Sequence, residues 1–274
     1  MSEHHHHHHH GHGHDGSGHD DAGMADLLRL DADVLHAYHL EVFDWIGSIG
    51  GAPATIVDLG SGIGVGAIAL AERFPKADVI ALDMSEEMID GLRSRATEAG
   101  TSVRAMLVDL DNGWPDITGV DLLWASNSMH HMGDPDRVLA AIFEALNPGG
   151  LLVVAEMDSF PRFLPDEIEA RAHQLRNEAA AAELPHLGAD WAALLTSAGF
   201  AIEAERHFDI DLGAPLPEAT GRYAQESLRL LRRHLGDRMD AADLDALDAL
   251  IDGVPTRSDL GLRTARTVWV ARRP

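Results

Sequence analysis

Acidic residues and a run of glycines stand where they could together bind a nucleotide-like ligand. An apolar pair at residues 56–57 leads into Asp58, and glycines then follow at alternate positions from Gly60 to Gly66. Glycine leaves room for a sharp turn and for the close approach of a ligand, and a helix that begins there directs unpaired N–H groups outward. The pattern predicts a strand, a tight turn and a helix start that form a cradle for such a ligand.

Two further acids follow predicted strands. Two short apolar segments downstream of the glycines end in Asp83 and in Asp109. Ligands of open α/β sheets bind beyond the carboxyl ends of the strands, so both acids should share one crevice with Asp58. Asp83 lies about twenty residues beyond the glycine turn, where an acid can accept both hydroxyls of a ribose. Ser85 is the better cap for the next helix, so we expect Asp83 to bind the ligand.

Strands and helices alternate strictly over the first part of the chain. A helix at residues 31–46 is predicted before the first strand, and the alternation then runs to a fifth strand at residues 151–155. Such alternation indicates a parallel sheet covered by helices on both faces. Later strands at residues 202–208 and 264–271 complete a seven-stranded sheet. The fold class is therefore α/β, a Rossmann-like and mostly parallel sheet.

Two long segments interrupt this order. Residues 158–187 contain an alanine-rich helical pattern, and residues 213–261 contain two more. Loops of such length inside a compact domain are usually functional, so we expect the two segments to form a helical cap over one edge of the sheet. The predicted organisation is one domain over residues 24–274, with a ligand-binding core at residues 52–157.

The first 23 residues form a histidine-rich tail that we expect to be disordered. It has too few apolar residues to fold, and it contains seven consecutive histidines, His4 to His10. The consecutive histidines favour a purification tag, whereas the irregular Gly/Asp pattern that continues through His19 suits a natural metal-binding tail. Both interpretations stay open, and the tail is excluded from the fold.

Composition excludes several classes of partner. The 274 residues are 45% hydrophobic, which is enough for one α/β core. Lys and Arg number 21 against 45 Asp and Glu, and a net charge of −24 argues against nucleic acid. No stretch approaches the roughly 18 apolar residues of a membrane span, so we expect no membrane partner and a soluble, cytoplasmic protein. The absence of cysteine excludes disulfides and thiolate metal sites, and the oligomeric state stays open.

The motifs resemble those of the class I methyltransferases, which use S-adenosylmethionine. The resemblance covers residues 55–157. It is carried by VDLGSGIG at residues 57–64, by the acid after VIAL, by the acid and leucine after the third strand, and by the NPGG turn at residues 147–150. It implies a last strand that pairs antiparallel, which residues 264–271 would supply.

The resemblance also assigns roles to single residues. The turn would cradle the methionine part of the cofactor, the acid after the second strand would hold the ribose, its neighbour would pack on the adenine, and the acid after the third strand would meet the adenine amine. The expected cofactor-binding residues are Asp58, Gly60, Ser61, Gly62, Gly64, Asp83, Met84, Asp109, Leu110 and Asn127.

Two adjacent histidines are the candidates for acid–base chemistry. His130 and His131 follow the fourth strand, where the acceptor approaches the sulfonium in this family, and the pair is similar to one in many small-molecule members. The loop lacks the Asn/Asp-Pro-Pro-aromatic tetrad of nucleic-acid and amide N-methyltransferases. An unperturbed imidazole titrates near pH 6.5, so His131 could serve as a base, although a packing role for the pair stays open. No metal is expected, because adjacent histidines diverge.

The sequence thus predicts a methyltransferase acting on a small-molecule acceptor, with oxygen, nitrogen or carbon as the methylated atom. We expect the two interruptions to build the acceptor pocket, with residues 213–261 as a lid. His36, Tyr38 and His39 on the first helix are further candidates to face the acceptor, although Tyr38 fits the apolar stripe and is expected in the core. One alternative is an NAD(P)-dependent oxidoreductase, because Gly62, Gly64 and Ala67 fit the dinucleotide motif. A non-catalytic S-adenosylmethionine-binding protein of the same fold is the other.

Overall fold

The computed structural model describes the chain from Ser17 to Pro274, apart from the side chains of residues 17–22 and 237. The first sixteen residues of the predicted tail lie outside this range. Helix α1 (Ser17–Val34) already includes residues 17–23, which the sequence analysis placed in the tail, so that boundary is wrong. A helix anchored by the buried Leu30 and Val34 extends easily, because each added residue gains one backbone hydrogen bond.

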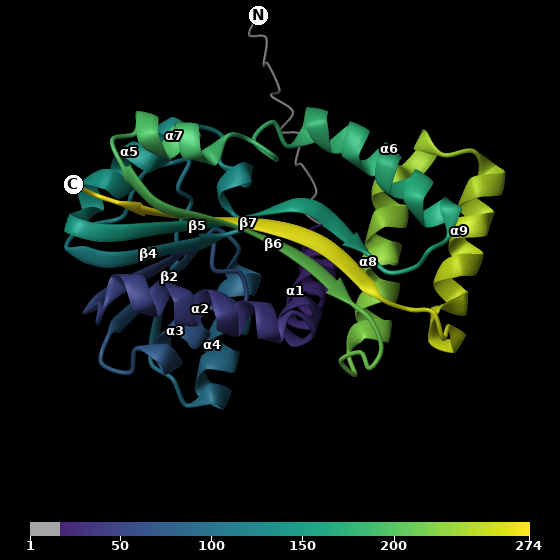
Figure 1. The fold of residues 1–274 in the computed structure, drawn as a ribbon, viewed down its shortest axis with the longest axis horizontal. Helices are drawn as coiled ribbons and strands as arrows, with labels where there is room; N and C mark the ends of the chain where they lie inside the picture. Colours follow the sequence, from purple (N-terminus) through teal and green to yellow (C-terminus); the bar gives the residue numbers. More distant parts are fainter. Residues whose placement is uncertain (1–16) are drawn as a thin grey trace, which may run out of the picture.

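Seven strands form one sheet with the order β3-β2-β1-β4-β5-β7-β6 (Figure 1). Strands β1 to β5 pair in parallel, and β7 lies antiparallel between β5 and β6. This confirms the predicted fold class and the antiparallel last strand. The strands are β1 (Thr55–Leu59), β2 (Asp78–Asp83), β3 (Val103–Leu107), β4 (Val120–Ser126), β5 (Leu146–Arg162), β6 (Ala201–Leu212) and β7 (Leu262–Arg272).

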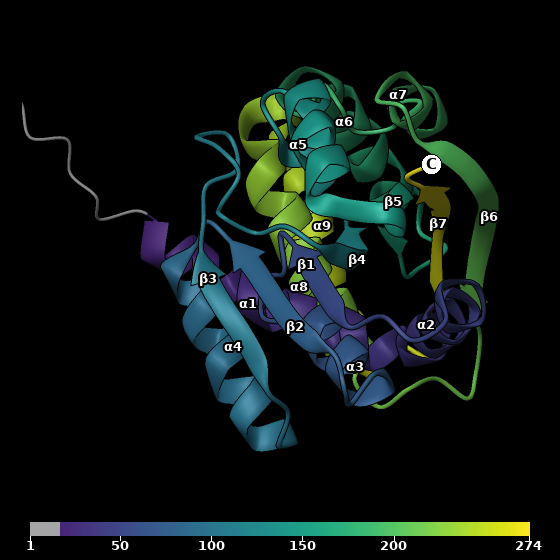
Figure 2. The ribbon, with the colours of Figure 1, turned by 90° about the vertical axis from the view of Figure 1, so that its left-hand side faces the viewer.

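The alternation of side chains along each strand builds two apolar cores, one on each face of the sheet. On β7, for example, Val268 points into one core and Trp269 into the other. Helices α5 (Pro135–Ala145) and α7 (Trp191–Ser197) cover one face. The opposite face is covered by α2 (His36–Gly50), α3 (Val65–Arg73) and α4 (Glu86–Ala99), as Figures 1 and 2 show.

The predicted helix caps are present. The Ser85 hydroxyl accepts a hydrogen bond from the Met88 N–H at the start of α4. Asp134 caps α5 in the same way, with Pro135 at the first helical position. These local signals define where two crossover helices begin, and therefore where the strand ends that precede them lie.

Three elements differ from the sequence prediction. The helix predicted at residues 31–46 is two helices that meet in a bend at the buried Leu35. No helix joins β3 to β4, so the alternation is not strict; Leu110 and Ile117 of the connecting loop fill the core where a helix would pack. Strand β5 has 17 residues instead of five, because its second half pairs with β7 beyond the rest of the sheet.

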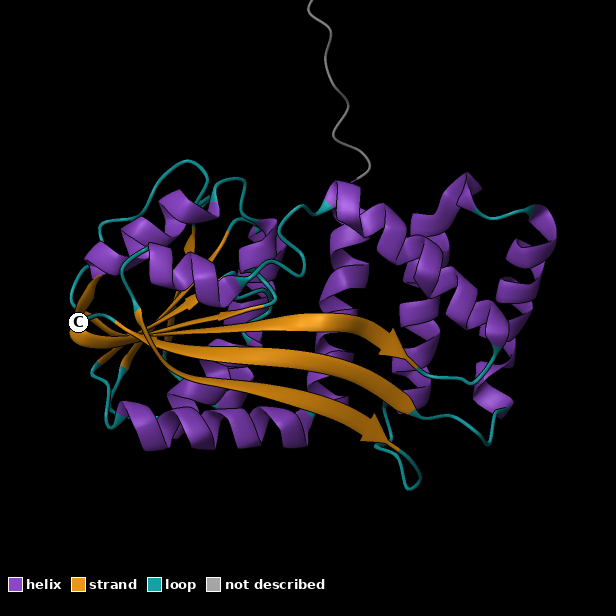
Figure 3. Cartoon of the chain, turned by 45° about the horizontal axis from the view of Figure 1, so that its top comes forward, coloured by secondary structure: helices purple, strands orange, loops and turns teal. Residues whose placement is uncertain are grey.

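The long strands carry a bundle of three helices, which are the predicted cap. Strands β5, β6 and β7 run past the other strands toward α6 (Glu167–Glu183), α8 (Thr220–Leu235) and α9 (Ala241–Gly253), as Figure 3 shows. The three helices pack against one another, and α8 also packs against α1. No helix among the described residues is long and apolar enough to cross a membrane.

Gly64, the residue before α3, should tolerate no side chain. Its φ is +81°, and a Cβ at this position would lie 2.5 Å from Leu92 Cγ. We expect Gly64→Ala to lower the free energy of unfolding by about 2–4 kcal/mol, from the left-handed backbone and from overpacking together. Chemical denaturation measures the loss.

Gly100→Ala is the matched control, because its φ is +65° but no atom lies within 4 Å of a Cβ placed there. It should cost about 1 kcal/mol, the backbone part alone. Equal losses in the two variants would show that contact with Leu92 does not restrict the turn.

Candidate functional site

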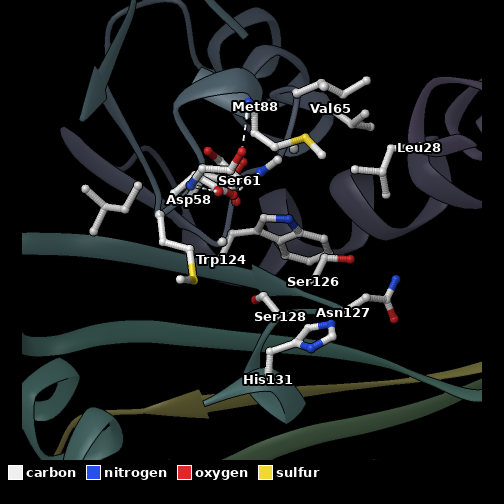
Figure 4. A pocket seen from close by; sticks show the side chains of 18 of the residues that line it. Leu28, Asp58, Ser61, Val65, Met88, Trp124, Ser126, Asn127, Ser128 and His131 are labelled. Carbon is white, nitrogen blue, oxygen red and sulfur yellow. Dashed lines mark hydrogen bonds between the residues drawn. The ribbon is translucent and has the colours of Figure 1, made fainter. Parts of the chain in front are cut away.

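A cavity of about 430 Å³ opens beyond the carboxyl ends of the central strands. Small-molecule sites usually have volumes of roughly 300–1,000 Å³. Figure 4 shows the Trp124 indole between Asp58 and Ser61 on one side and the loop with Asn127 and His131 on the other. Of the predicted site residues, the wall contains Asp58, Gly60, Ser61, Gly62, Asp83, Met84, Asp109, Leu110, Asn127 and His131, whereas Gly64 and His130 do not line it.

The glycine turn is held by backbone hydrogen bonds to the end of β2. The Ser61 N–H donates to the Leu82 carbonyl over 2.9 Å, and the Gly62 N–H donates to Asp83 Oδ2 over 2.7 Å. Gly60 has a φ of +64°, and any side chain there would collide with Ser128. Glycine is therefore required at residue 60 both for the turn and for the approach of the loop after β4.

Asp58 is the most perturbed acid of the site. It is 2% exposed, and its Oδ2 has no hydrogen-bond partner among the described residues. The pKa of Asp58 is raised to about 7, mainly by burial and in smaller part by the nearby Asp83, against the effect of a hydrogen bond from the Ala67 N–H. A Cβ on Gly66 would lie 2.9 Å from Asp58 Oδ2 and 2.6 Å from Trp124 Nε1, so only glycine fits where these two side chains pack against the start of α3.

Asp83 uses both carboxylate oxygens within the protein. Oδ1 accepts from the Ser85 N–H over 2.9 Å, and Oδ2 accepts from Gly62. Each oxygen has a second lone pair, so the carboxylate can still accept from a ligand in the cavity. Met84 beside it is 71% exposed, which is unusual for a large apolar side chain.

Asp109 also lines the cavity, and both of its carboxylate oxygens accept hydrogen bonds from residues of the turn that follows it. Oδ1 accepts from the Asp111 N–H over 2.9 Å, and Oδ2 accepts from Asn112 Nδ2 over 2.6 Å. These bonds fix the direction of the carboxylate at the end of β3. Leu110, which is buried, closes the wall beside it.

The two histidines have different environments. His130 is buried, and its Nδ1 lies 2.5 Å from Glu156 Oε2, while the other oxygen of Glu156 accepts from the Met129 N–H. His130 is therefore a structural partner of Glu156, away from the cavity. His131 is exposed at the cavity, where partial desolvation and the neighbouring His130 lower its pKa to about 4. The pKa of His131 therefore lies below the 6.5 of an unperturbed imidazole.

Asn127 has an unusual backbone. Its φ is +49°, and its N–H donates to the Ala155 carbonyl over 2.8 Å. The side-chain Oδ1 is buried without a hydrogen-bond partner among the described residues. A non-glycine residue in this region costs of order 1–3 kcal/mol and is kept where the surrounding structure fixes it, often at a binding site.

The cap helices do not form the wall. None of the lining residues belongs to α6, α8 or α9; the N-terminal helices contribute Met24, Leu28, Asp31, His39 and Phe43 instead. The residues that line this cavity therefore do not come from the two interruptions, and the closure of residues 213–261 over a bound acceptor stays a prediction. The long strands β5, β6 and β7 carry these helices away from the other strands (Figures 1 and 3), whereas Leu28 of α1 lies close to Gly62 of the glycine turn.

Arg266 on β7 is a lining residue that sequence analysis missed. It is 3% exposed, and one terminal nitrogen donates to Asp31 Oδ1 over 2.6 Å. The same oxygen accepts from the Tyr223 hydroxyl of α8, also over 2.6 Å. The available signal was a single cation in the otherwise apolar or small-residue segment TARTVWVA, at the position that pairs with Met157 of β5.

Residues 56–150 match the model of a methyltransferase domain. A curated trans-aconitate 2-methyltransferase of Variovorax paradoxus (strain S110) is 35% identical over 132 residues, which are 48% of this chain and 46% of that protein. The chain spans about half the length of the first curated relatives that it matches. The match therefore concerns the domain rather than the whole proteins.

Solved structures share the fold at low identity. Phosphoethanolamine N-methyltransferase 2 of Haemonchus contortus, in complex with phosphomonomethylethanolamine and S-adenosylhomocysteine, has a TM-score of 0.56 at 16% identity and covers 95% of this chain and 59% of its own. The [4+2]-cyclase SpnF has a TM-score of 0.53 at 22% identity, over 85% of this chain and 80% of its own. Residues 56–150 therefore form a methyltransferase domain, and the described chain has the fold of the class I methyltransferases.

Proposed function

We propose that this protein transfers a methyl group from S-adenosylmethionine to a small-molecule acceptor. The observation that carries the proposal is the buried carboxylate oxygen of Asp58, which has no partner among the described residues and lies beside the glycine turn of a methyltransferase domain. A buried acceptor without a partner is costly, so a positively charged donor is the group that suits it.

The cavity residues fit the methyl donor along its length. Asp58 and the N–H groups of the glycine turn would hold the charged methionine part, and the free lone pairs of Asp83 would accept the two ribose hydroxyls. Exposed Met84 offers an apolar surface to the adenine, and Asp109 would accept from its amine. The bound cofactor supplies an electrophilic methyl group on a cationic sulfur.

The protein's own part in the reaction is positioning and the exclusion of water. Trp124 and Phe43 give the cavity an apolar wall between the two ends, and the loop with Asn127 and His131 faces it from the other side. Holding an acceptor in line in such a pocket supplies most of the acceleration that a displacement needs. The neutral imidazole of His131 can take the proton that the acceptor loses.

The sheet argues against the oxidoreductase alternative. In dinucleotide-binding sheets the sixth strand continues the parallel order, whereas here the antiparallel β7 is inserted between β5 and β6. Proteins of one fold can carry out different reactions, as the [4+2]-cyclase of similar fold illustrates. A binding protein without transferase activity is therefore the second candidate. The cytoplasmic location and the methylated atom stay predictions.

Calorimetry tests the proposal. The protein should bind S-adenosylmethionine and S-adenosylhomocysteine with micromolar dissociation constants and should not bind NAD or NADP. In Asp83→Ala, affinity should fall at least tenfold, because a charge-assisted hydrogen bond is worth about 1.5–3 kcal/mol. Asp78→Asn, at the exposed start of β2, is the control and should bind like the wild type. Tighter binding of NAD than of the methyl donor would overturn the assignment.

Asp58→Asn separates stability from binding. The pKa of Asp58 is about 7 in the folded protein and 3.8 in the unfolded chain. At pH values between these two, the folded protein therefore keeps a proton on Asp58 that the unfolded chain has lost. Stability from this residue therefore falls as pH rises, and between pH 5 and pH 8 the wild type should lose about 2–3 kcal/mol relative to the variant. Denaturation curves at both pH values measure this difference.

Asp58→Asn should also weaken the binding of S-adenosylmethionine at least tenfold at pH 8, because it removes the negative charge that would hold the ammonium group. If the variant binds the cofactor as the wild type does, Asp58 only supports the turn.

His131→Asn tests proton transfer, with an acceptor found by transfer of label from methyl-labelled S-adenosylmethionine. The turnover number should fall about a hundredfold while cofactor affinity is kept, and the acidic limb of the pH profile, expected near pH 4, should disappear. His36→Asn is the control, since His36 is exposed on α2 and does not line the cavity. A turnover number within a few fold of the wild type would exclude His131 as the base.

A further inference from the structure

The cavity extends across the sheet from β3 to β7. Asp109, Asp83 and Asp58 mark the ends of β3, β2 and β1, in the half that would hold the cofactor. Arg266 lies on the other side of β4, where it pairs with Met157 of β5 in the antiparallel ladder. The strand order therefore places Arg266 in the half of the cavity left for the acceptor, which is the basis of an inference that rests on the proposed function.

The guanidinium of Arg266 has more donors than partners. One N–H donates to Asp31, the buried Nε has no acceptor, and no hydrogen bond joins the second terminal nitrogen to any described residue. A guanidinium carries five N–H donors in a planar fork that matches a carboxylate. The side chain is 3% exposed and lines the cavity, so a group bound in the cavity can supply an acceptor for the remaining donors.

The neighbours of Arg266 do not supply the missing acceptor. Asp31 Oδ1 already accepts from both Arg266 and Tyr223. The Tyr38 ring faces the guanidinium at 5.4 Å, but its buried hydroxyl has no partner, and burial raises its pKa to about 12, so it stays protonated. His39 lines the same end and is neutral at pH 7, because burial lowers its pKa to about 4.

Charge distinguishes Arg266 from the rest of the wall. The other charged lining residues of the described chain are acidic, and Arg266 is the one Lys or Arg among them. An amine acceptor could bind Asp31 Oδ2, but it would bring further donors and leave those of the guanidinium unfilled. A group that brings acceptor oxygens matches the unfilled donors better.

We infer that the acceptor is a small carboxylic acid, and that Arg266 binds one of its carboxylates as a specificity-determining contact through the N–H groups that Asp31 leaves unused. Asp31 keeps the guanidinium in place from the opposite side. The neutral His39 can donate a hydrogen bond to the bound carboxylic acid or accept one from it. The bound carboxylate would orient the molecule so that another of its atoms faces the half of the cavity that would hold the cofactor.

The test uses variants that avoid an unpaired buried charge. Asp31→Asn/Arg266→Gln removes both charges and keeps an amide that can accept from Tyr223, whereas Arg266→Lys keeps the charge and removes the fork. Arg272→Gln is the matched control, because Arg272 lies on the same strand and pairs with Glu203 away from the cavity.

Calorimetry should be run with and without saturating S-adenosylhomocysteine, using succinate, citrate and trans-aconitate as probes and succinamide and 1,4-diaminobutane as neutral and cationic counterparts. We expect at least one carboxylate to bind the wild type and Arg272→Gln equally, and to bind at least tenfold more weakly in the double variant and in Arg266→Lys. Succinamide should not bind.

The outcomes separate this inference from the proposed function. Failure of all three acids to bind, with S-adenosylhomocysteine bound normally, overturns the carboxylate inference alone. The inference is also overturned if 1,4-diaminobutane binds the wild type and Asp31→Asn/Arg266→Gln abolishes that binding. It is overturned as well if Arg272→Gln weakens the binding of the acids as much as the Arg266 variants do. Failure of the cofactor to bind overturns the proposed function, and carboxylate binding to the free protein still decides the role of Arg266.

Discussion

The site depends on the hydrogen bonds that tie the glycine turn to the end of β2. Ser61 and Gly62 donate their N–H groups to Leu82 and Asp83, so the turn after one strand is fixed by the neighbouring strand. This arrangement sets the direction of α3 and leaves Asp58 buried beneath it. The raised pKa of Asp58 and the close packing of Asp58 and Trp124 on Gly66 follow from the same geometry.

Local rules were sufficient for most of the core. The caps at Ser85 and Asp134, the strand-end acids and the glycine turn depend on neighbours within a few residues, so the sequence alone predicted them. The same holds for the meeting of Asp58, Asp83 and Asp109 at one cavity, because parallel strands bring their carboxyl ends to one edge.

The acceptor side could not be predicted from local patterns. Arg266 and Asp31 are 235 residues apart, and their pairing depends on how far β7 extends beyond the sheet and on where α1 crosses it. The bend at Leu35 has no proline or glycine to signal it. His130 and His131 are adjacent and of one type, so only packing could show that one pairs with Glu156 and the other reaches the cavity.

Helix α1 is shared by both halves of the cavity. Met24 and Leu28 form part of the wall beside the glycine turn, while Asp31, one to two turns further on, holds Arg266 of β7 and Tyr223 of α8. An acceptor that binds Arg266 and shifts the Asp31–Arg266 pair would therefore also shift α1, which the cofactor contacts at its other end. Thermodynamic linkage makes such an effect mutual: each ligand would alter the affinity of the other by the same factor, although they touch different strands.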